Sequence, residues 1–149
     1  MNEVEKWLAD QRAAYDHLCA RGKLYIGSKR PKGFRQMRRK ECFSNSQIIA
    51  TLESWRDRGW SRRPRYVEGL CTGAGGTFAH GWLTLDGQRA IDVTLPDAEQ
   101  RAYFGIEISH AVVRKGMRSG FYQQHLTGLG SVLVPPQLIE AAETLKRTA

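Results

Sequence analysis

The pattern of polar and apolar residues predicts an α+β fold for this chain of 149 residues, a length typical of one compact domain over residues 1–149. Two apolar stripes at helical spacing come first, alternating residues with turn signals follow, and a third helical stripe ends the chain. We therefore expect N-terminal helices that pack on an antiparallel β-sheet.

The two early helices are expected within the first 60 residues. Apolar residues recur at intervals of three, four or seven over residues 3–20, which predicts a helix there. A second stripe, from Ile48 to Trp55, predicts a helix that stops at Gly59 and whose first turn lies at or just after Cys42. The basic stretch Lys29–Lys40 between them has the composition of a loop.

Strand signals fill the middle of the chain. Asp86-Gly87 separates two runs of alternating residues, which is a strong hairpin signal. Two prolines, Pro135-Pro136, precede the last helix, whose N-terminus suits proline. We expect strands at residues 66–71, 80–85, 89–95 and 105–113, and a flexible glycine-rich flap at residues 72–76.

Composition excludes several classes of protein. The net charge of +8 and the pI near 9.8 favour polyanionic or acidic partners. Three cysteines without a close pair indicate free thiols, and no CxxC or HExxH spacing supports a metal site, so we expect no cofactor. The acidic N-terminus lacks the apolar core of a secretion signal, and no apolar run approaches the ~20 residues of a membrane span. We expect a cytoplasmic protein without membrane contact.

Cys42 has the electrostatic setting of a cysteine nucleophile. A helix start favours the thiolate through its free N–H groups and its dipole. Arg38, Arg39 and Lys40 add positive potential directly upstream. Cys19 instead lies on an apolar helix face, and Cys71 ends a strand.

The hairpin supplies a base and a carboxylate. With a three-residue loop, Leu85-Asp86-Gly87, His80 lies directly opposite Asp92 and both point to one face. A two-residue loop would put them on opposite faces, but it separates apolar from polar residues less cleanly. We therefore expect an imidazole that a carboxylate orients.

These residues resemble the transglutaminase-like branch of the papain-like cysteine enzymes. In that family a cysteine at a helix start is followed by His-Ala-Trp on one strand and Asp-Pro-Thr on the next, as in His80-Gly-Trp and Asp92-Val-Thr here. The resemblance covers roughly residues 36–105 and departs from the pattern at Gly81 and Val93. It implies a papain-like core with Cys42 as nucleophile, His80 as general base and acid, and Asp92 as orienter.

The resemblance also implies an activity. The position of Gln36, six residues before Cys42, matches an oxyanion-stabilising glutamine, and the backbone N–H of Cys42 would be the second donor. The expected activity is acyl transfer on an amide through a thioester, of the peptidase, deamidase or transglutaminase type, with a protein or peptide substrate.

Two basic clusters support other hypotheses. Lys29–Lys40 and Arg56–Arg65, with Phe34, Trp55 and Trp60 interleaved, have the composition of a nucleic-acid-binding surface or of a surface for an acidic substrate. The alternatives are a basic nucleic-acid-binding module with an inert cysteine, and an inactive member of the same fold that binds a partner.

Overall fold

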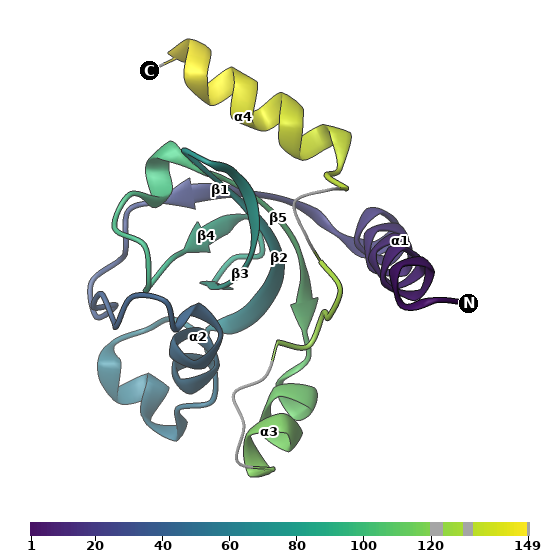
Figure 1. Ribbon diagram of the computed structural model, residues 1–149. Coiled ribbons are helices and arrows are strands. Elements are labelled where there is room, and N and C mark those ends of the chain that lie inside the picture. Colours follow the sequence, from purple (N-terminus) through teal and green to yellow (C-terminus); the bar gives the residue numbers. More distant parts are fainter. Residues whose placement is uncertain (120–123, 130–132, 149) are drawn as a thin grey trace.

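A computed structural model describes residues 1–119, 124–129 and 133–148, and its α+β architecture confirms the expected class. Five strands close into a barrel, and helices lie around its outside (Figure 1). The elements are α1 (Glu3–Arg21), β1 (Lys23–Ser28), α2 (Cys42–Ala50), the 3-10 helix η1 (Glu53–Arg58), β2 (Arg65–Gly73), β3 (Gly76–Thr84), β4 (Arg89–Ile91), the 3-10 helix η2 (Ala98–Gln100), β5 (Ala102–Ile108), α3 (His110–Arg118) and α4 (Pro136–Thr148).

The strand order around the barrel is β1-β4-β3-β2-β5. β2 pairs antiparallel with β3 on one side and with β5 on the other, and these are the longest pairings of the barrel. β1 closes the ring by pairing antiparallel with β5 and parallel with β4. The expected antiparallel sheet is thus a closed barrel with one parallel pair, because the basic stretch before Cys42 is preceded by a strand, β1, that the sequence analysis did not identify.

Aromatic side chains fill the barrel. Trp82 is fully buried and meets Tyr25 and Tyr103 edge-on, with ring centroids 5.8 and 5.0 Å apart. Gly105 of β5 leaves the space for this, since a Cβ there would lie 2.6 Å from the Trp82 ring. Trp82 is therefore a packing residue of the barrel core.

A second core lies between α2, η1 and the outer face of β3 and β4. Ile49 of α2 belongs to this core together with Leu83, Ile91 and Val93. Phe34 stacks on Trp60 in the same cluster, with ring centroids 4.3 Å apart. This core fixes α2, and therefore Cys42, on the barrel wall.

The terminal helices contribute less to the core. α1 projects from the barrel (Figure 1), and Leu18 is its buried residue, whereas Val4, Trp7 and Leu8 are at least half exposed. α4 packs through Leu138, Ala141 and Leu145. The N-terminal stripe therefore predicted the helix correctly, but most of its apolar face does not pack on the sheet. No helix within the described ranges is long and apolar enough to cross a lipid bilayer.

Three local expectations were wrong. The expected flap at residues 72–76 is a tight hairpin in which Gly73 pairs with Gly76. The strand expected over 105–113 ends at Ile108, because the Ser109 side chain caps α3 by accepting from the Val112 N–H. The second helix breaks into α2 and η1.

Candidate active site

Cys42 is the first residue of α2, as expected, and it is partly buried. The preceding Glu41 makes no side-chain cap, so the N–H groups of the first turn are not used by it. Lys40 has φ = 65°, the left-handed region, and it is the non-glycine residue with positive φ in the described part of the chain. A sharp, strained turn therefore delivers the chain to Cys42.

The segment before this turn is held against the residues that follow β4. Asn45 donates from Nδ2 to the carbonyl oxygen of Arg38 at 2.7 Å and to Oγ1 of Thr94 at 3.0 Å. The Met37 N–H donates to the carbonyl of Val93 at 2.6 Å. Buried Asn45 thus ties the approach to Cys42 to the turn that carries Asp92.

The hairpin that carries His80 differs from its expected register by two residues. Leu83 pairs with Ile91, whereas the three-residue loop would have placed it opposite Arg89. The side chain of Asp86 accounts for the wider turn, since it accepts from the N–H groups of Gln88 and Arg89 at 2.8 Å each. A slip of two residues keeps every side chain on its face, so His80 and Asp92 still point the same way.

Asp92 lies directly after β4, not within a strand reaching residue 95. Its Oδ1 accepts from the N–H groups of Thr94 and Leu95, both at 2.9 Å, which turns the chain. Its Oδ2 accepts from His80 Nε2 at 2.7 Å and from the Tyr103 hydroxyl at 2.8 Å. Four donors therefore fix a fully buried carboxylate.

The partners of His80 raise its affinity for a proton. Burial by itself lowers the pKa of the imidazole, but the hydrogen bond and charge of Asp92, together with a hydrogen bond to the thiol of Cys42, raise it to about 9. Burial likewise opposes ionisation of Asp92, and the bonds from His80, Leu95 and Tyr103 hold the pKa of that carboxyl below its usual value. At neutral pH the favoured state is an imidazolium next to a carboxylate.

The three groups form a row. Asp92 occupies Nε2 of the imidazole, which leaves Nδ1 as the ring nitrogen for the Cys42 thiol. The ring lies nearly parallel to that of Trp82 and offset from it, with centroids 6.3 Å apart and planes 23° apart. The arrangement has a sulfur nucleophile, a group that moves a proton to or from it, and a carboxylate that orients this group.

A second polar group lies on the other face of β2 and β3. Tyr66 accepts a hydrogen bond from Gln47 Nε2 at 3.2 Å. Glu68, also buried, accepts from the N–H groups of His125 and Leu126 at 2.7–3.1 Å. Burial raises the pKa of Glu68 to about 6 despite these bonds. Glu68 therefore holds the segment 124–126 on the barrel, and Tyr66, which lies next to Glu68, also has its pKa raised by Cys42.

Gln36 is exposed and precedes Met37, which is bonded to Val93. Its role as an oxyanion donor stays a prediction.

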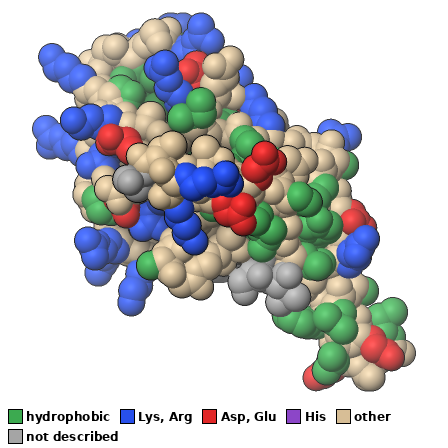
Figure 2. Space-filling view, turned by 90° about the horizontal axis from the view of Figure 1, so that it is seen from above, with side chains coloured by type: hydrophobic (Ala, Val, Ile, Leu, Met, Phe, Trp, Pro, Cys, Tyr) green, Lys and Arg blue, Asp and Glu red, His purple; other side chains and the backbone are tan. Residues whose placement is uncertain are grey.

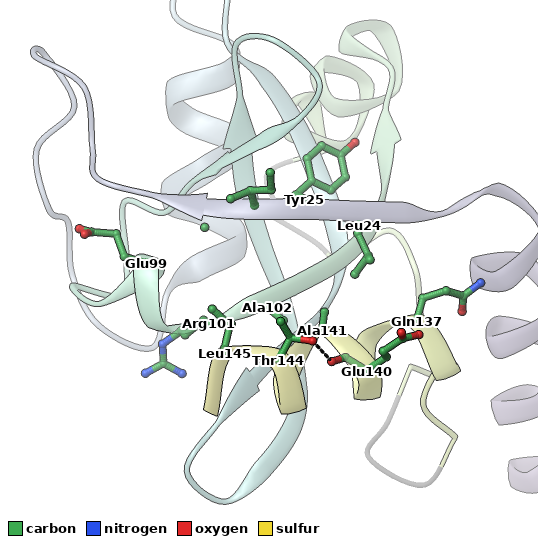
Figure 3. A pocket seen from close by; sticks show the side chains of 12 residues that line it. Leu24, Tyr25, Glu99, Arg101, Ala102, Gln137, Glu140, Ala141, Thr144 and Leu145 are labelled. Carbon is green, nitrogen blue, oxygen red and sulfur yellow. Dashed lines mark hydrogen bonds between the residues drawn. The ribbon is translucent and has the colours of Figure 1, made fainter. Parts of the chain in front are cut away.

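A groove of about 480 Å³ lies between β1 and α4 (Figure 3). Leu24, Ala141 and Leu145 give it an apolar wall, and Glu140 and Arg101 lie among its polar lining. None of its lining residues is a cysteine or a histidine, so it does not supply a nucleophile. Within the described residues, no group of three or more His, Cys, Asp and Glu side chains could hold a metal ion.

The sequence analysis missed two groups of the site. Tyr103 could not be placed there from sequence, because its contact with Asp92 depends on how β5 sits in a barrel whose closure local patterns do not reveal. Asn45 lies one turn after Cys42, and that helical spacing is a signal that could have drawn attention to it.

Comparison with known proteins gave no match: no family model, no curated protein and no solved structure matches this chain.

Proposed function

We propose that this protein is a cysteine-dependent acyl-transfer enzyme that acts on an amide of a protein or peptide. The observation that carries the proposal is the row of Cys42, His80 and Asp92, in which one buried imidazole bonds a carboxylate at 2.7 Å and has its pKa raised by the nearby thiol of Cys42, the first residue of a helix.

The reaction follows from the protonation states. With the proton on His80, the thiolate sulfur of Cys42 attacks the amide carbonyl carbon, and first-turn N–H groups of α2 stabilise the oxyanion. The C–N bond then breaks as His80 gives its proton to the departing nitrogen. A water or an amine attacks the thioester, gives its proton to His80 and releases the Cys42 thiolate.

The arrangement of elements supports a papain-like core as the framework of this proposal. A helix that begins with the cysteine packs on a barrel, one strand of the barrel carries the histidine, and the chain after the next strand carries the aspartate. The donors of the 36–40 segment, Gln36 included, belong to the same proposal.

Trapping of the thioester tests the proposal. The protein would be incubated with a mixture of glutamine-containing peptides, quenched in acid and measured by intact mass. We expect an acyl adduct on Cys42 that hydroxylamine removes and that is absent from Cys42→Ala. An adduct that persists in Cys42→Ala, or the absence of any adduct and of any peptide product, would contradict acyl transfer at this residue.

A further inference from the structure

The positive charge of the chain is concentrated around Cys42. Twelve of the 23 Lys and Arg, but three of the 15 Asp and Glu, lie between residues 29 and 65. This stretch therefore carries a net charge of +9 and the remainder of the chain −1, which together give the total of +8. Because Cys42 lies within this stretch, the charge and the proposed nucleophile share one part of the molecule.

Folding joins the two basic clusters into one surface. Phe34 of the first cluster stacks on Trp60 of the second, and the Arg58 guanidinium lies 5.5 Å from the centre of the Trp60 ring. A Cβ on Gly33 would lie 3.2 Å from the carbonyl oxygen of Arg58, which shows how closely the two segments pass. We call the exposed cations of this surface the basic face: Lys32, Arg35, Arg39, Lys40, Arg56, Arg58 and Arg62.

Most charges of the basic face are not neutralised within the chain. Four cations of the two clusters lie outside the basic face because they have partners: Arg38, Arg63 and Arg65 pair with Glu41, Glu53 and Glu107, and Arg30 donates to the backbone after β4. Lys32, Arg35, Arg39 and Lys40 have no acidic group within ion-pair distance among the residues described here. In the view of Figure 2, Lys and Arg side chains crowd one side of the molecule, while hydrophobic side chains gather toward the opposite end.

The buried aromatic residues favour one class of polyanion. Single-stranded nucleic acid is held by bases that stack on exposed aromatic side chains between cations. Phe34 and Trp60 are each 6% exposed and stack on each other, so they offer little face to a base, and the Arg56 guanidinium lies over the ring of the partly buried Trp55, 5.0 Å from its centre. Guanidinium groups without such platforms suit carboxylates, which they bind in a two-pronged manner.

We propose that the basic face binds an acidic segment of the polypeptide whose amide is presented to Cys42. As a statement about substrate, this inference rests on the proposed acyl transfer. The surface would raise the rate of encounter with acidic chains and place carboxylates beside the turn of residues 38–41.

Binding to a Cys42→Ala protein tests the inference without any turnover. The probe is a fluorescein-labelled peptide of twelve residues, with six Asp or Glu interspersed with Gly and Gln, measured by anisotropy. Arg35→Glu/Arg62→Glu reverses one charge in each cluster. Lys6→Glu/Lys146→Glu changes the net charge equally on α1 and α4. All four residues are exposed, and no ion pair involves them within the described part of the chain.

We expect the Kd to rise at least tenfold in Arg35→Glu/Arg62→Glu and less than twofold in Lys6→Glu/Lys146→Glu. Equal weakening by both variants, or no binding by the parent protein, would overturn the inference. Displacement of the peptide by oligothymidine of equal charge, at lower concentration than unlabelled peptide requires, would overturn it in favour of nucleic acid. A failure here leaves the chemistry of Cys42 untouched, since that chemistry is measured by thioester trapping.

Discussion

Gly81 lies between the candidate nucleophile's helix and the polar group on β2. A Cβ at this position would lie 3.0 Å from the Tyr66 hydroxyl oxygen and 3.1 Å from Cδ1 of Phe43. In this chain Tyr66 and Phe43 therefore occupy the space that a methyl group at position 81 would need.

Gly81→Ala is therefore expected to lower the free energy of unfolding by about 1–2 kcal/mol through overpacking. Urea denaturation measures the change. Gly75→Ala is the matched control, since nothing lies within 4 Å of its Cβ position, and it is expected to change stability by less than about 0.5 kcal/mol. Combining Gly81→Ala with Tyr66→Phe should recover part of the loss; an undiminished loss would show that Tyr66 does not cause it.

Asp92 controls the protonation of His80. Its bond and its charge raise the pKa of the imidazole to about 9, so Asp92→Asn should bring that pKa down toward or below the ordinary value near 6.5. NMR titration of the His80 ring measures this. Tyr103→Phe removes a donor to the same oxygen but keeps the charge, so the His80 pKa should stay raised. A His80 pKa near 9 in Asp92→Asn would contradict the argument.

At the scale of elements, the turn before α2 determines where Cys42 lies. Lys40 adopts the left-handed conformation although it is not a glycine. Asn45 holds the turn in place by donating hydrogen bonds to the carbonyl of Arg38, before the turn, and to the hydroxyl of Thr94, after β4. Such conformations cost roughly 1 kcal/mol or more in a residue with a side chain, and the surrounding bonds have to offset that cost.

Substitutions at Lys40 should separate strain from charge. Lys40→Gly relieves the conformation and is expected to raise the free energy of unfolding by up to about 1 kcal/mol, whereas Lys40→Val should lower it by about 1–2 kcal/mol. Thermal unfolding measures both. Lys40→Gln is the control: it removes the charge, as the other two variants do, but keeps an unbranched side chain, so its stability should resemble that of the parent protein. A similar loss of stability in all three variants would show that the charge of Lys40, and not its backbone conformation, is responsible.

At the scale of the whole molecule, the features that depend on local sequence patterns were predicted, and the features that depend on closure of the barrel were not. The helices α1, α2 and α4, the hairpin and the common face of His80 and Asp92 followed from period and turn residues, because a two-residue slip preserves the face, whereas α3 begins where a strand was expected. The strand β1 and the bond from Tyr103 could not be predicted, since they depend on pairing between strands far apart in the chain.

The stability of the fold should fall as the pH rises through the range set by His80. A histidine whose pKa is about 9 in the folded chain and about 6.5 unfolded stabilises the fold fully below pH 6.5, and this contribution, on the order of 3 kcal/mol, is lost as the pH approaches 9. The pKa of Asp92 is lowered, so its contribution is present at neutral pH and is lost in acid.

Urea denaturation at pH 6.5 and pH 9 measures this loss. Glu68, whose pKa is raised to about 6, loses its own stabilising contribution as the pH rises from about 4.5 to about 6, so the range from pH 6.5 to 9 reports mainly on His80. Asp92→Asn should flatten the profile between pH 6.5 and 9. An equally steep decline in this variant would assign the effect to another group.

The central claim is that Cys42 is a nucleophile activated by His80, and alkylation tests it most directly. The rate of iodoacetamide modification would be followed against pH for each cysteine by mass spectrometry, in the parent protein and in His80→Ala. Cys71 is an internal control, because burial raises its pKa to about 12. We expect Cys42 to react well below pH 8.5, the range of a free thiol, and to lose this reactivity in His80→Ala. If Cys42 reacts no faster than Cys19 at every pH, or if His80→Ala leaves its profile unchanged, the account of the site is wrong.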